Sequence, residues 1–142
     1  MAKVDGRVIE FAPWQTPFEN ERAEIQEVVY SPWLQGHGGA KFDLVIKLWI
    51  QSTQIKYLVA FEAISAFRVL DEHGLTDLWS RTAELGGRPG PTTFLVRNHR
   101  WLDESALIFA TGSRENWSFV IATGTDCVEI VALDHPTVTI EI

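Results

Sequence analysis

Alternating apolar residues mark two neighbouring segments near the middle of the chain. Every second position is apolar from Phe42 to Ile50, and again from Ile55 to Phe61. This period of two is typical of strands with one buried face. A two-residue turn at Ser52-Thr53 would set apolar residues opposite each other along that face. The expected pairs are Ile50 with Ile55, Leu48 with Tyr57, Ile46 with Val59 and Leu44 with Phe61. The pattern predicts a β-hairpin that points one face into a core.

The same reasoning predicts further strands along the chain. They cover residues 7–11, 93–97, 106–111, 117–123, 127–132 and 137–142, with a weaker continuation after residue 61. A turn at Gly124-Thr125 predicts a second hairpin. Its expected pairs are Ile121 with Val128, Phe119 with Ile130 and Trp117 with Ala132.

Residues 19–30 fit two descriptions. Their glutamates, with Phe18, Ile25 and Val28 on one side, suit a helix. The β-prone run that ends at Ser31-Pro32 suits a strand. We favour a strand over residues 24–30.

A helical period occurs once, between residues 75 and 85. Apolar or small side chains recur there three and four positions apart, and Gly86-Gly87 supplies a stop. The residues on this face are Leu75, Leu78, Trp79, Thr82 and Leu85. A helix of about three turns is marginal alone, so it should pack on the sheet.

These elements predict a mainly antiparallel β protein of the α+β class. We expect a curled sheet, barrel or sandwich of about eight strands, with one short helix at 75–85. The length of 142 residues suits a single domain over 1–142.

Charge and cysteine content narrow the functional classes. The net charge of −7 disfavours nucleic acid and anionic membranes as partners, whereas it suits a basic protein partner. One cysteine excludes an intramolecular disulfide and suits a reducing compartment. The first residues lack the apolar core of a signal peptide, and no long apolar run suggests a membrane span. We therefore expect a cytoplasmic location.

Two groups of charged residues are candidate ligand sites. Arg97, Arg100 and Trp101 form the one basic and aromatic cluster of this acidic chain. It could stack a base or clamp a phosphate or carboxylate, or it could be a solvated turn whose Trp101 folds back on the core. Asp43 and Glu62 would face each other at the end of the first hairpin, where like charges are unfavourable. They could share a proton or hold a cation, or simply splay into water.

Histidine and cysteine show no metal-binding pattern. The histidines at 37, 73, 99 and 135 lack the spacing of a zinc site, and we expect each to be an exposed loop residue. Cys127 lies inside a strand with Glu129 next on the same face, which disfavours a reactive thiolate. We therefore expect neither a metal nor a cofactor.

Trp14 and Trp33 lie in proline-containing loops. An exposed indole there can anchor a protein partner, although it can equally plug the open end of a sheet. No complete catalytic constellation accompanies them. The leading hypothesis is a non-enzymatic protein-interaction module, in one form a neutraliser of a basic toxin or nuclease, or else a homodimer. The alternative is a small-ligand-binding protein or enzyme with a cleft near the Arg97–Trp101 loop.

Overall fold

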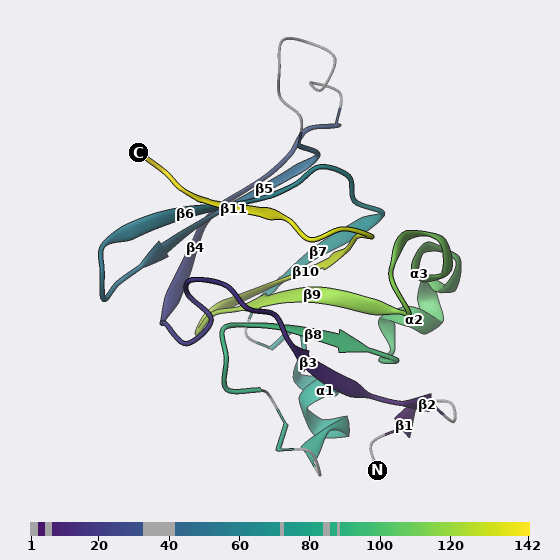
Figure 1. Ribbon diagram of the computed structural model, residues 1–142. Coiled ribbons are helices and arrows are strands. Elements are labelled where there is room, and N and C mark those ends of the chain that lie inside the picture. The colour runs from purple at the N-terminus through teal and green to yellow at the C-terminus, as the bar shows by residue number, and fades with distance from the viewer. Residues whose placement is uncertain (1–2, 5–6, 33–41, 72, 84–85, 88) are drawn as a thin grey trace.

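Two antiparallel sheets face each other across the apolar side chains of the predicted hairpin. Figure 1 shows the four-stranded sheet above the five-stranded sheet, with helix α1 beneath the latter. The structure is a computed structural model that describes residues 3–4, 7–32, 42–71, 73–83, 86–87 and 89–142. The predicted class, mainly antiparallel β of the α+β type, is confirmed, and the two sheets do not close into a barrel.

The four-stranded sheet has the order β11-β6-β5-β4. Its strands are β4 (Ala23–Tyr30), β5 (Leu44–Ile50), β6 (Ile55–Phe61) and β11 (Thr137–Ile140). Strands β5 and β6 pair in the predicted register, from Leu44 with Phe61 to Ile50 with Ile55. Their connection is a four-residue loop rather than a two-residue turn. Gln54 adopts a positive φ of 62°, and its N–H donates to the Ile50 carbonyl at 2.8 Å. The strand that we favoured over residues 24–30 is also confirmed as β4.

The five-stranded sheet has the order β3-β8-β9-β10-β7. Its strands are β3 (Glu10–Pro13), β7 (Ala66–Asp71), β8 (Thr93–Arg97), β9 (Trp117–Ala122) and β10 (Asp126–Val131). The second hairpin pairs Ile121 with Val128 and Phe119 with Ile130, as predicted. Its ladder ends there, so the expected pair of Trp117 with Ala132 is not part of it. The predicted first strand divides between β3 and a two-stranded ribbon of β1 (Lys3–Val4) and β2 (Arg7–Val8).

The main core lies between the two sheets. Because side chains alternate along a strand, each hairpin sends every second residue into this layer. Leu44, Ile46 and Leu48 of the upper sheet are fully buried there, as are Ile121 and Ile130 of the lower sheet. The apolar pattern of both hairpins therefore describes one shared interior.

A second apolar layer lies on the other face of the five-stranded sheet. Helix α1 (Thr76–Arg81) and its N-cap cover this face. The covering side chains are Leu75, Leu78 and Trp79, which belong to one cluster with Phe94 and Val120 of the sheet. The predicted helix is thus confirmed but shorter than expected. Leu85 lies outside the described residues.

The predicted strand over residues 106–111 is wrong. Residues 101–112 instead form two short helices, α2 (Trp101–Glu104) and α3 (Ala106–Gly112), at one end of the lower sheet. A continuous apolar run does not distinguish a buried strand from a helix. Here Leu102 of α2 and Phe109 of α3 are buried in one cluster with Val131 of β10. The fold therefore has three helices among the described residues rather than one, and none of these is long and apolar enough to cross a membrane.

Two of the outermost strands have irregularities. Strand β3 ends in Pro13, which pairs with Phe94 but has no N–H to donate. Strand β4 carries a bulge, because its register with β5 shifts between Ile25 and Glu27.

The buried face of the hairpin can be tested by matched truncations. Ile46 is fully buried between the sheets, whereas Ile140 of the same sheet is 55% exposed. We expect Ile46→Ala to lower the free energy of unfolding by about 2–5 kcal/mol, because it leaves a cavity. Ile140→Ala should cost about 0.5 kcal/mol or less. Urea unfolding measures both, and equal losses would contradict the assigned faces.

Candidate functional site

A charged side chain lies on the outer face of the five-stranded sheet. Glu129 is the middle outward residue of β10, between Cys127 and Val131, and only 1% of its side chain is exposed. Its neighbours on this face belong to two apolar clusters, one under α1 and one under α2 and α3. A lone carboxylate in such a place would be strongly destabilising, so it requires partners.

Three side chains from three other segments satisfy Glu129. Arg68 of β7 donates to Oε1 from Nε at 2.9 Å and from its terminal nitrogen at 2.6 Å. Ser118 of β9 donates to Oε2 at 2.6 Å, and Nε2 of His99 lies 2.5 Å from the same oxygen. An ionised carboxylate offers about four acceptor positions. All of them are therefore used.

These contacts keep Glu129 ionised. Burial raises the pKa of its carboxyl group. This effect is outweighed by the charge interaction and hydrogen bond with His99, by the charge of Arg68 and by the hydrogen bond from Ser118. The net result is a pKa of about 2, lowered from the usual 4.5. Glu129 is thus a buried carboxylate that stays negatively charged.

His99 itself is almost fully enclosed. It follows β8, only 2% of it is exposed, and its ring meets Phe109 of α3 edge-on at 6.1 Å. Because an ionised carboxylate only accepts hydrogen bonds, Nε2 must carry the proton in the contact with Glu129. The other ring nitrogen, Nδ1, is buried and has no hydrogen-bond partner among the described residues. The expectation of an exposed loop histidine is wrong here.

A cleft of about 350 Å³ opens beside this histidine. Four basic side chains line it, namely Arg68, Arg81, Arg100 and His99. The apolar lining comes from Ile9, Leu75, Leu78 and Trp101. Glu104 is the one acidic residue in the described lining. We call this space the arginine cleft. Trp101 forms part of its wall, with Arg68 stacked 4.5 Å from the centre of the indole ring.

The arginine cleft contains two of the predicted ligand-binding residues. Arg100 and Trp101 both line it, and Trp101 also folds back on Phe109 at 5.5 Å. Arg97 does not line it. Its guanidinium pairs with Glu10 and Glu115 and stacks 4.6 Å from the ring of Trp117.

Asp43 and Glu62 also lie outside the described lining of the cleft. The β5–β6 ladder ends at Leu44 and Phe61, one pair before them. The Asp43 carboxylate accepts a hydrogen bond from the Ile64 N–H at 3.2 Å, while its own N–H donates to Phe61 and Glu62 carbonyls. Asp43 thus holds the turn into β7, and the structure does not join these two residues to the arginine cluster.

Of the two loop tryptophans, Trp14 lies among the described residues. Trp14 is only 3% exposed and packs edge-on against Phe119 at 5.1 Å, so it plugs the core. Its burial agrees with the alternative expectation, that the indole plugs the core, and leaves little of the ring exposed to a partner. Trp33 lies outside the described residues.

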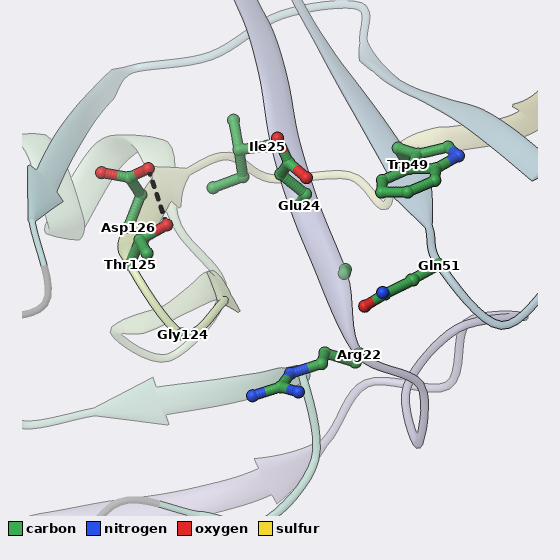
Figure 2. A pocket seen from close by; sticks show the side chains of 9 residues that line it. Arg22, Glu24, Ile25, Trp49, Gln51, Gly124, Thr125 and Asp126 are labelled. Carbon is green, nitrogen blue, oxygen red and sulfur yellow. Dashed lines mark hydrogen bonds between the residues drawn. The ribbon is translucent and has the colours of Figure 1, made fainter. Parts of the chain in front are cut away.

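A larger opening lies between the β9–β10 turn and the start of β4. Figure 2 shows Arg22 and Gln51 on one side of it and Thr125 and Asp126 on the other. Its volume is about 380 Å³. The charged and amide groups that line it are solvent-exposed or half-buried, and Thr125 donates to Asp126 within the turn at 3.2 Å. The arginine cleft differs in having a buried polar side chain, His99, in its lining, so it is the better candidate site.

Comparisons with known proteins add no functional assignment. No protein-family model, curated protein or solved structure matches the chain. Among the described residues, no group of three histidine, cysteine, aspartate or glutamate side chains is placed to hold a metal ion.

Sequence reasoning missed the residues at the centre of the site. A usable signal was present in β10, where Glu129 interrupts an otherwise apolar strand of Cys127, Val128, Ile130 and Val131. A charged residue in the middle of a strand buried on both faces requires a partner of opposite charge. Arg68 and His99 gave no such signal, because their meeting depends on how β7 and the β8–α2 turn pack on β10.

The buried carboxylate predicts a distinctive dependence of stability on pH. The pKa of Glu129 is lowered in the folded state, so its contribution is complete above about pH 5 and is lost as the pH falls toward 2. Between about pH 6 and about pH 3 this group should cost the wild type about 2 kcal/mol. Glu129→Gln should lower stability by about 3 kcal/mol at neutral pH and remove that part of the acid dependence.

Glu10→Gln is the matched control for this experiment. It removes a carboxylate that pairs with Arg97 but is 42% exposed. We expect a loss below about 1 kcal/mol and an unchanged acid profile. Urea titrations at several pH values measure both variants. An acid profile of Glu129→Gln that matches the wild type would contradict the assignment.

Proposed function

We propose that the protein binds a small organic anion in the arginine cleft. The observation that supports this proposal is the concentration of basic side chains at one concave place in an acidic chain. The net charge is −7, yet three arginines and a histidine share this cleft with one glutamate in its described lining. Arginine in a partly enclosed site suits carboxylate and phosphate groups, because its planar fork matches their oxygens.

The apolar part of the lining suggests the rest of the ligand. Leu75, the N-cap of α1, and Leu78 within the helix are buried beside the cleft, and Trp101 is half-buried. Small-molecule sites commonly combine an apolar wall with a few fixed polar groups. A carboxylate or phosphate attached to a compact apolar or aromatic group fits both halves of this lining.

Binding of simple anions tests the proposal. Phenyl phosphate, benzoate and inorganic phosphate should raise the thermal unfolding midpoint, because a ligand that binds only the folded state stabilises it. Arg100→Gln should weaken the affinity for phenyl phosphate about tenfold or more, as measured by calorimetric titration. Arg114→Gln is the control, because Arg114 is 70% exposed and pairs with Asp134 and the Leu133 carbonyl. Failure of all three anions to bind would overturn the proposal.

We also propose a second function, docking to a basic protein partner. It is supported by the net charge of −7 and by the outer face of the four-stranded sheet, which no described helix covers. On this face Lys47 is held between Glu27 and Glu141 at 3.7 and 3.2 Å. The buried position of Trp14 removes one argument for this function, so it is the less supported of the two.

Light scattering distinguishes docking from self-association. A complex with a basic ribonuclease should form at low salt and dissociate at high salt, because ions screen exposed charges. The chain alone, measured at two concentrations, shows whether a homodimer forms instead. An unchanged mass in both experiments would count against docking through charge and against the homodimer.

A further inference from the structure

Arg68 is held from two directions beside the arginine cleft. Its Nε and Nη2 both donate to Oε1 of the buried Glu129, at 2.9 and 2.6 Å. Its Cζ lies over the ring of Trp101, 4.5 Å from the ring centre. A guanidinium group with an ion pair along one edge and an aromatic ring against it has little freedom to turn. The side chain is therefore oriented before any ligand binds.

These contacts leave part of the guanidinium group free to bind a ligand. Arginine carries five N–H donors in a rigid fork, and Glu129 accepts from two of them. The other three, two on Nη1 and one on Nη2, have no acceptor in the part of the chain that the structure describes.

The Nη1 atom of Arg68 is open to solvent. Only two buried side-chain nitrogen or oxygen atoms of the described residues lack a hydrogen-bond partner, namely His99 Nδ1 and Glu141 Oε2. Since Nη1 also lacks a partner but is not one of these, it is not buried. The side chain as a whole is 29% exposed and lines the arginine cleft. A ligand in the cleft can therefore reach this end of the guanidinium group.

The free donors of Arg68 have a fixed shape. One N–H of Nη1 and the remaining N–H of Nη2 point the same way in one plane, as two parallel donors for a carboxylate. Both oxygens of a carboxylate then have a donor. A phosphate monoester keeps a third oxygen outside this plane, and its second charge is costlier to remove from water. Because Glu129 already offsets part of the charge of Arg68, a singly charged ligand fits better.

We propose that the arginine cleft selects carboxylates and that Arg68 binds them through the edge formed by Nη1 and Nη2. This inference rests on the proposed function and names its ligand class and the residue that anchors it. Each carboxylate oxygen accepts one N–H, while Nε and the second N–H of Nη2 stay on Glu129. Leu75 and Leu78 of the same lining contact the organic part of the ligand.

Replacement of Arg68 by lysine tests this anchor with the positive charge retained. An ammonium group can pair with Glu129, but it is a point charge without a second edge of parallel donors. We expect Arg68→Lys to weaken the binding of benzoate about tenfold or more at about pH 7. Calorimetric titration measures the affinity.

Arg97→Lys is the matched control for this variant. Arg97 is a strand residue with 27% of its side chain exposed, and it pairs with Glu10. Its guanidinium lies 4.6 Å from the centre of the Trp117 ring. It resembles Arg68 in all these respects but does not line the arginine cleft. The affinity of Arg97→Lys for benzoate should equal that of the wild type.

A series of ligands on the wild type tests the proposed class. Benzoate should bind about tenfold or more tightly than benzamide, in which a neutral NH₂ group replaces one of the two acceptor oxygens. It should also bind more tightly than phenyl phosphate. In Arg68→Lys the advantage of benzoate over benzamide should shrink, because the two parallel donors are gone. Tighter binding of phenyl phosphate than of benzoate to the wild type would overturn the carboxylate class.

Nitrogen-15 NMR of the arginine side chains covers the case in which Arg68→Lys does not fold. When benzoate is added to the wild type, the Nη signals of Arg68 should shift and those of Arg97 should stay. Shifts of other arginines without Arg68 would overturn the anchor. Equal affinity of wild type and Arg68→Lys for benzoate would do the same and leave the anion site standing. If benzoate, phenyl phosphate and inorganic phosphate all fail to bind, the proposed function and this inference are both overturned.

Discussion

The ionised carboxylate of Glu129 constrains the helical side of the molecule more than any other group. It lies on an otherwise apolar sheet face, so every one of its acceptor positions must be filled. The donors come from β7, β9 and the segment after β8, which lie up to 61 positions from Glu129 along the chain. Satisfying one side chain thus fixes the relative placement of several segments, and through His99 it also fixes the wall of the arginine cleft.

The two faces of the five-stranded sheet pack against different elements. The inner face contributes only to the shared core with the other sheet. The outer face is divided by Glu129 and Ser118 into one apolar cluster under α1 and another under α2 and α3. Helix α1 covers one cluster, and helices α2 and α3 cover the other. The arginine cleft is lined by residues of both α1 and α2. A polar group in the middle of a sheet face therefore explains why the covering layer has an opening there.

The predictable part of this fold is the part governed by local alternation. Both hairpin registers follow from which residues are apolar, because a shift by one position would turn each apolar side chain outward. Helices α2 and α3 were not predictable in this way, since the apolar run from Ala106 to Phe109 fits a strand as well as a helix. Of the site, Arg100 and Trp101 were recognisable as a basic and aromatic pair. The link between Glu129 and His99 depends on tertiary packing between residues 30 positions apart, and no local pattern reports it.

The irregularities in the edge strands β3 and β4 affect the tendency of the protein to aggregate. Exposed strand borders are templates on which a neighbouring chain can add a strand, and repeated addition leads to fibrils. At the end of β3, an approaching chain would meet the ring of Pro13 in place of a donor. Along β4, the extra residue between Ile25 and Glu27 breaks the even spacing that continued addition requires. Each sheet thus carries, on one of its borders, a feature that discourages polymerisation without any change to the interior.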